Sequence, residues 1–92
     1  MLGGDAEWSR LLAEQVGGNS RLLYRLAFGV LRDGAAAEDV CQQALLKAWE
    51  RRESLRDAAA LRAWLARVVV TESLYARRRR AVERRVLGRQ WR

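Results

Sequence analysis

The sequence contains no proline and no histidine, and Cys41 is its single cysteine. Without histidine, and with one thiol, the common zinc sites and nucleophile–base pairs cannot be assembled. One cysteine forms no internal disulfide, so the cysteine pattern gives no sign of a secreted protein. We therefore expect a protein that is not an enzyme, uses no metal or other cofactor, and packs Cys41 as a small apolar residue.

Long apolar runs are also missing. No segment approaches the ~20 apolar residues that span a bilayer, and the N-terminus lacks the basic flank and apolar stretch of a signal peptide. We expect a cytoplasmic protein. Residues that favour strands are few, whereas alanine, leucine, arginine and glutamate dominate a chain of 92 residues. This composition predicts one small all-α domain.

Apolar residues recur every three or four positions in four segments, which predicts a compact bundle of about four helices. The segments are approximately 6–16, 20–31, 36–52 and 58–80. Gly17–Gly18 and Asp33–Gly34 are turn signals between them. Asn19 or Ser20 can cap the second helix, and Asp57 can cap the fourth.

The core is predicted from one apolar stripe on each helix. Val68–Val70 favours a strand locally, but the flanking pattern is helical over a longer window. The predicted core residues are Trp8, Leu11, Leu12, Val16, Leu22, Leu23, Leu26, Ala27, Val30, Leu31, Ala37, Val40, Cys41, Ala44, Leu45, Ala48, Trp49, Leu61, Trp64, Leu65, Val68 and Val69.

The net charge of +7 is unevenly distributed. Residues 1–57 contain eight Lys or Arg and nine Asp or Glu, whereas residues 58–92 contain ten Arg and two Glu. The excess positive charge favours a polyanion, nucleic acid before an acidic membrane, as the partner of the C-terminal end. We predict a helical domain over 1–80 and a basic extension, either a helix or a tail, over 81–92.

One face of the third predicted helix carries an acid and amides. Asp39, Gln42, Gln43 and Leu46 stand three and four residues apart, so they share a face beside the buried stripe. Such a face can dock another helix through hydrogen bonds around an apolar centre. An ordinary solvated helix face explains the same pattern, and these residues alone do not decide between the two.

The strongest charge signal is Arg77–Arg80, followed by Arg84–Arg85. Arginine guanidinium groups suit phosphate oxygens. Tyr75 lies just before this run, roughly on one helical line with Trp64, Arg67 and Thr71. Aromatic rings interleaved with arginines suit single-stranded nucleic acid, because bases stack while phosphates pair. A solvated basic tail is the alternative.

Four blocks together resemble domain 2 (region 2) of bacterial RNA polymerase sigma factors of the extracytoplasmic-function (ECF) group. The blocks are Leu23–Ala27 (LYRLA), Ala37–Gln42 (AEDVCQ), Trp64–Val68 (WLARV) and Arg77–Arg80. They stand in the family's order and spacing, and no single block is decisive. The resemblance implies a sigma factor domain 2-like bundle that serves as a transcription initiation module.

The resemblance also implies roles for individual residues. The helix of the second block binds the β′ clamp helices of core RNA polymerase in this family, which implies docking by Asp39, Gln42, Gln43 and Leu46. The following connector holds a base flipped out of the non-template −10 strand, which implies that role for Ser54, Leu55, Arg56 and Asp57. The fourth helix lies along the promoter −10 DNA and helps to open it, which implies DNA contacts by Arg62, Arg67, Thr71, Tyr75, Arg77, Arg78, Arg79 and Arg80. The family usually has an anti-sigma factor as a further partner.

The chain departs from the family pattern in three places. Thr71 stands where the family usually has asparagine, so the contact made by that asparagine does not carry over directly. Leu45 replaces a frequent phenylalanine, which is a conservative core change. The sequence ends at Arg92 without the helix-turn-helix domain of a full ECF sigma factor. We therefore expect this chain alone not to recognise the promoter −35 element.

Two other functions fit the same composition. A generic basic helical protein would coat nucleic acid without sequence preference and without touching polymerase. A helical protein-interaction module would use its basic tail on an acidic partner or membrane surface. The tail lacks the broad aromatic and leucine face that a membrane-binding helix needs, so we expect no membrane partner.

Overall fold

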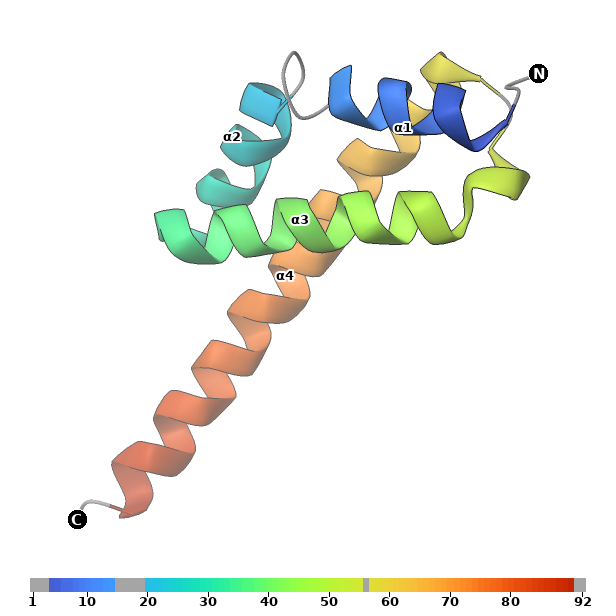
Figure 1. The fold of residues 1–92 in the computed structure, drawn as a ribbon. Helices are drawn as coiled ribbons and strands as arrows, with labels where there is room; N and C mark the ends of the chain where they lie inside the picture. Colours follow the sequence, from blue (N-terminus) through green and yellow to red (C-terminus); the bar gives the residue numbers. More distant parts are fainter. Residues whose placement is uncertain (1–3, 15–19, 56, 91–92) are drawn as a thin grey trace.

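Every predicted helix is present in the computed structural model, which describes residues 4–14, 20–55 and 57–90. The elements are α1 (Asp5–Glu14), α2 (Ser20–Leu31), α3 (Gly34–Glu50), the short 3-10 turn η2 (Arg52–Ser54) and α4 (Ala58–Gln90) (Figure 1). No strand occurs among these described residues, so the all-α prediction is confirmed. Val16 and the turn and cap predicted at Gly17–Gly18 and Asn19 lie outside them.

Helices α2, α3 and α4 pack against one another, and α1 contacts α3. Helix α4 crosses α3 and then continues beyond the bundle as an arm, which gives the molecule extents of 57 × 22 × 17 Å (Figure 1). The helix runs without interruption through the boundary predicted after residue 80. The basic extension is therefore helical as far as Gln90, and its separation from the domain stays a prediction.

Small side chains bring α3 close to its neighbours. Three of its alanines, Ala37, Ala44 and Ala48, are fully buried, and α4 places Leu61 and Leu65 in the same core. Because the distance between packed helices depends on the side chains at the contact, the alanines permit close approach. The buried apolar residues are Trp8, Leu23, Ala27, Leu31, Ala37, Val40, Ala44, Ala48, Leu61, Leu65 and Val69.

One predicted core residue is wrong, because Leu22 is 55% exposed. Helix α2 buries Leu23, Ala27 and Leu31, which stand four residues apart and form one stripe. Leu22 lies about 100° around the helix from Leu23 and therefore outside that stripe. The spacing of apolar residues is compatible with burial of either Leu22 or Leu23, whereas only one of them can face α3 and α4.

The third helix lies two residues earlier in the chain than predicted. Asp33 is its N-cap, and the Asp33 Oδ1 atom accepts a hydrogen bond from the Ala36 backbone N–H at 3.1 Å. At the other end, the Arg52 guanidinium donates to the Trp49 carbonyl oxygen at 2.8 Å. This bond satisfies one of the carbonyls that a helix end leaves free, so the chain turns into η2 after Glu50. Asp57 caps α4 as predicted, since its Oδ1 atom accepts from the Ala60 N–H at 2.8 Å.

Ser73 is an exception within the core. Its side chain is fully buried on α4, and its hydroxyl is the one buried side-chain polar atom without a hydrogen-bond partner in the described part of the chain. A buried hydroxyl that is shielded from water and has no partner costs stability.

We expect Ser73→Ala to raise the free energy of unfolding by about 1 kcal/mol, since it removes the desolvated hydroxyl and keeps the side chain small. Thermal and urea unfolding followed by circular dichroism would measure the change. Ser54→Ala is the control, because the Ser54 hydroxyl is exposed and donates to the Arg51 carbonyl at 2.8 Å. A lower stability of the Ser73 variant would contradict this account.

Candidate functional site

The outward side of α3 brings together the four residues that the sequence singled out. Asp39, Gln42, Gln43 and Leu46 are all exposed, and Leu46 is 57% exposed although it is apolar. The alanines on the opposite side of α3 are fully buried, which fixes the direction in which this outward side points. The result is an apolar side chain surrounded by acid and amide groups, a surface suited to docking a helix.

Glu50 extends this surface by one turn, and the sequence analysis missed it. It is exposed and follows Leu46 by four residues, so the helical period places the two on the same side of α3. The spacing could have identified it. Lys47 does not belong to the surface, because its ammonium group forms a salt bridge with Glu72 on α4.

The connector between α3 and α4 is held by Arg52, which the sequence analysis also missed. The Arg52 guanidinium carbon lies 4.1 Å from the centroid of the Trp49 ring, and its Nε donates to Asp5 Oδ1 at 2.9 Å. Together with the bond to the Trp49 carbonyl, these interactions join the connector to both α3 and α1. Trp49 itself is half-buried against the core.

The predicted base-holding residues of the connector have local structural roles. The Ser54 hydroxyl donates to the Arg51 carbonyl, Leu55 packs half-buried against the core, and Asp57 caps α4. Arg56 lies outside the described residues. In the described part of the connector, Glu53, Ser54 and Asp57 are exposed, and Ser54 and Asp57 are each held by a local hydrogen bond.

One side of α4 carries the line of residues predicted from the sequence. Of that line, Arg67, Thr71 and Tyr75 are exposed, with Tyr75 57% exposed, whereas Trp64 is half-buried. Arg78, three residues after Tyr75, is exposed and extends the line. Thr71, Tyr75 and Arg78 line a shallow hollow together with Leu74, which the sequence analysis missed. An exposed ring beside a guanidinium group is an arrangement that can stack a base and pair with its phosphate.

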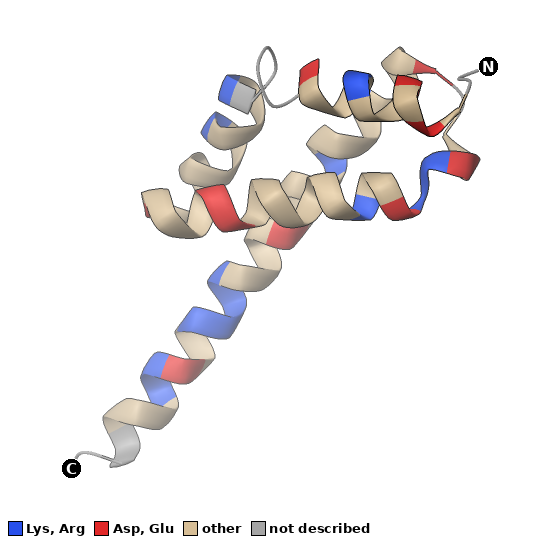
Figure 2. Cartoon of the chain, viewed as in Figure 1, with Lys and Arg blue, Asp and Glu red and all other residues tan. Residues whose placement is uncertain are grey.

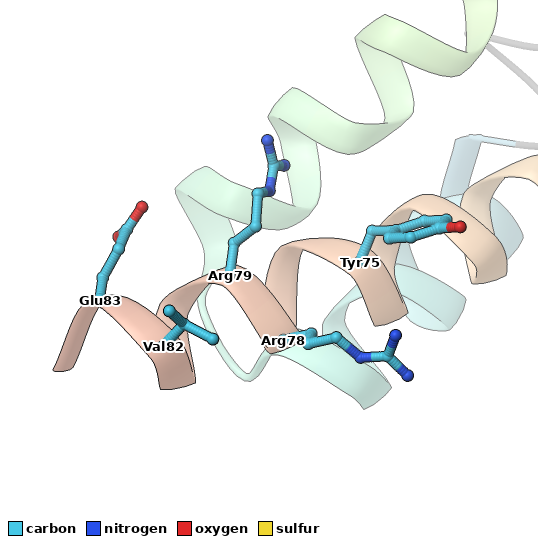
Figure 3. Close-up of a pocket in the computed structure, with 5 residues that line it drawn as sticks. All are labelled: Tyr75, Arg78, Arg79, Val82 and Glu83. Carbon is cyan, nitrogen blue, oxygen red and sulfur yellow. The ribbon is translucent and has the colours of Figure 1, made fainter. Parts of the chain in front are cut away.

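A second hollow adjoins the first along α4. It is lined by Tyr75, Arg78, Arg79, Val82 and Glu83. The Tyr75 ring and the Arg78 side chain both extend towards the N-terminal part of the helix, whereas the Arg79 and Glu83 side chains point upward in the view, with Val82 between them (Figure 3). Val82 is another exposed apolar residue that the sequence analysis did not assign to this surface.

The remaining arginines of the predicted DNA surface do not share one side of α4. By the helical period, Arg62 and Arg77 lie on other sides of the helix than Arg67 and Arg78. Arg80 points back to the bundle, where its guanidinium donates to Asp33 Oδ2 at 2.8 Å. Consecutive residues turn about 100° around a helix, so a run of four cannot present a single face.

The charge on the two surfaces is opposite. Lys and Arg predominate on the α4 arm, whereas the outward side of α3 has acids and amides (Figure 2). The pKa of Asp33, where α3 meets α4, is lowered, because the Ala36 N–H and then the Arg80 guanidinium hydrogen-bond to its ionised form. The pKa of the Cys41 thiol is raised, mainly because the thiol is removed from water.

Metal-binding groups and membrane-spanning helices are both missing from the described residues. No three histidine, cysteine, aspartate or glutamate side chains are grouped there as a metal ion would require. Among the helices that the structure describes, none has both the length and the apolarity to cross a membrane.

The chain matches the Sigma-70 region 2 family over residues 16–83. It is 39% identical over 71 residues to the ECF RNA polymerase sigma factor SigL of Mycobacterium tuberculosis, a match that covers 76% of this chain and 40% of SigL. It is also 40% identical over 43 residues to the probable RNA polymerase sigma factor RfaY of Xanthomonas campestris pv. campestris, covering 47% of this chain and 11% of RfaY. No solved structure is significantly similar to the chain.

These similarities establish that the chain belongs to the Sigma-70 region 2 family, and they confirm the resemblance to region 2 of an ECF sigma factor. The chain spans about two fifths of the length of SigL. Helices α2 and α3 and most of α4 lie within the matched range of residues 16–83. The helical fold described above is therefore that of the region 2 part of the chain.

We expect Asp33→Asn to destabilise the protein less than Asp33→Ala, because asparagine still caps α3 but loses the charge that pairs with Arg80. The lowered pKa means that the carboxylate stabilises the fold above about pH 4, the ordinary aspartate value, and that this stabilisation is lost as the pH falls below it. Melting temperatures between pH 2 and pH 7 would test this. A constant difference between wild type and Asp33→Asn over that range would contradict it.

Proposed function

We propose that this chain is the module of a transcription initiation factor that binds core RNA polymerase and recognises and melts the promoter −10 element. The observation that carries the proposal is the outward side of α3. Asp39, Gln42 and Gln43 surround an exposed Leu46 there, and none of the four is buried in the core. Membership of the Sigma-70 region 2 family supports it, as do the names of the similar proteins.

In this proposal, α3 docks on the β′ clamp helices of polymerase. A partner helix would cover Leu46 and pair with the surrounding acid and amides. Because the outward direction of α3 is fixed by its buried alanines, docking would also orient α4 and the connector relative to polymerase. The module needs no catalytic group, and we propose that it works in the cytoplasm as a binding protein without enzymatic activity.

The connector and α4 would capture the opened −10 strand. Separating DNA costs ~1.4 kcal/mol per base-pair step in stacking, and each base stacked on an aromatic ring returns ~1–3 kcal/mol. Tyr75 supplies an exposed ring on α4, with Arg78 beside it and Arg67 about two turns earlier on the same side of the helix for phosphates. Ser54, Leu55, Arg56 and Asp57 would hold the flipped base, and Arg52 would hold the start of the connector against α3 and α1. We also propose an anti-sigma factor as a regulatory partner, as is usual for this family.

Polymerase docking is tested by titrating the chain against an isolated β′ clamp-helix fragment. We expect saturable micromolar binding that Asp39→Arg or Leu46→Ala weakens by about tenfold or more, which is ~1.4 kcal/mol. Glu14→Arg is the matched control, since Glu14 is an exposed acid at the end of α1 and away from this surface. A folded wild-type chain that does not bind, or a Glu14 variant that loses as much as the Asp39 variant, would reject docking through α3.

Strand capture is tested separately with a fluorescent non-template −10 oligonucleotide. Tyr75→Ala should weaken binding by ~1–3 kcal/mol, roughly fivefold to a hundredfold, because it removes the stacking ring. Tyr75→Phe keeps the ring and should bind nearly as well as wild type. Equal binding of the −10 strand, a scrambled strand and duplex DNA would instead indicate a generic basic nucleic-acid-binding protein.

A further inference from the structure

Helix α2 has an exposed basic side that neither the α3 surface nor the α4 line uses. Its opposite side buries Leu23, Ala27 and Leu31, so Arg21, Arg25 and Phe28 point outward. Arg32 is exposed directly after the helix ends. We call Arg21, Arg25, Phe28 and Arg32 the α2 outer face.

This face carries positive charge without compensation. Helix α2 contains no acid from Ser20 to Leu31. In the described residues, none of the three arginines of the α2 outer face takes part in a salt bridge, whereas Arg52 and Arg80 elsewhere do. Arg21 and Arg25 stand one turn apart, a spacing at which like charges weaken a helix. Folding alone therefore gives no reason for this pair.

Arg32 adds an independent observation. Its backbone has φ 55°, in the left-handed region, and its N–H donates to the Phe28 carbonyl at 2.8 Å to end the helix. Glycine is the usual residue at this position, because a side chain there is strained. An arginine that accepts this strain on an exposed turn is consistent with a side chain retained for a ligand.

Phe28 supplies an aromatic surface among the arginines. It is 37% exposed, and its ring stacks on that of Tyr24 with centroids 5.8 Å apart and an interplanar angle of 19°. The stacking holds the ring in a fixed orientation while part of it stays open to solvent. A fixed, partly open ring between guanidinium groups is suited to stacking a base while the flanking phosphates are paired.

The C-terminal end of α2 adjoins the arm of α4. Leu31, the last residue of α2 and part of its buried side, lines one hollow together with Arg80, Glu83, Arg84 and Leu87. Arg80 is paired with Asp33, but Arg84 bonds only to the Arg80 carbonyl, at 3.4 Å, so its charge is not paired with an acid among the described residues. Figure 2 shows basic residues both on α2 and on the arm of α4, with uncharged segments between them.

We propose that the α2 outer face is a second binding surface for a single-stranded polynucleotide, separate from the Tyr75–Arg78 line on α4. Arg21, Arg25 and Arg32 pair with phosphates of the strand, and Phe28 stacks on a base. This goes beyond the −10 contacts of the proposed function, which involve only α4 and the connector. The chemistry is common to DNA and RNA, and the experiment distinguishes the two.

The test measures binding of the full chain to fluorescent oligo-dT and oligo-rU of equal length over a range of salt concentrations. The double variant Arg21→Ala/Arg25→Ala should bind at least tenfold more weakly. The slope of log affinity against log salt should shrink by about 1.4, or ~0.7 for each phosphate that is no longer neutralised. Arg10→Glu is the control with the same charge change, because Arg10 is exposed on α1, outside both proposed surfaces. Circular dichroism would establish that each variant is folded.

If the α2 double variant binds like the control while Tyr75→Ala still loses affinity, the α2 surface is rejected and the proposed function stands. If the α2 double variant loses affinity and Tyr75→Ala does not, the α2 surface stands and strand capture by α4 fails. Weaker binding of oligo-dT alone identifies DNA as the ligand, and weaker binding of oligo-rU alone identifies RNA.

The base-stacking step is tested with Phe28→Leu, which removes the aromatic ring but no charge. This variant should bind the preferred strand more weakly than wild type, with an unchanged slope of log affinity against log salt. An unchanged affinity would reject the base contact.

Discussion

The close contact of α3 with its neighbours is the constraint on which the rest of the molecule depends. Alanines 37, 44 and 48 leave no alternative rotation for α3, because turning the helix would bury acids and amides and expose its small apolar side. The same contact presses Leu61 and Leu65 of α4 into the core. Two surfaces of opposite charge are thereby presented in fixed relative positions, and neither requires a flexible loop.

Salt bridges at the edges of the bundle add to the apolar contact between the helices. The Lys47–Glu72 and Asp33–Arg80 pairs join α4 to α3 at two levels, and Arg52 joins the connector to α1. Each pair is partly exposed, so its contribution to stability is modest. Their main effect is on the relative orientation of the helices. Each salt bridge pairs a charge on one element with a charge on another and so favours one arrangement.

The helices are well predicted from the sequence, because their apolar periods are regular and their caps are local. The helical prediction for Val68–Val70 is confirmed, since the longer window outweighs β propensity. The prediction for Leu22 is wrong because two adjacent leucines satisfy the same pattern, and only tertiary packing selects between them. The grouping of Asp39, Gln42, Gln43 and Leu46 follows from helical spacing. The pairing of Arg52 with Asp5 and of Arg80 with Asp33 could not be found this way, since each pair is separated by 47 residues in the sequence.

The Asp33–Arg80 pair lies at the point where α4 leaves the bundle, and beyond it the helix has no further support from α3. The ten residues from Ala81 to Gln90 extend for about 15 Å at the helical rise. The pair thus lies at the point about which the arm of α4 would pivot. A change of ~10° in the direction of α4 at this point would move the far end by about 2–3 Å, comparable to the length of a hydrogen bond. A partly exposed ion pair at the base therefore contributes to how accurately the charges at the tip are positioned.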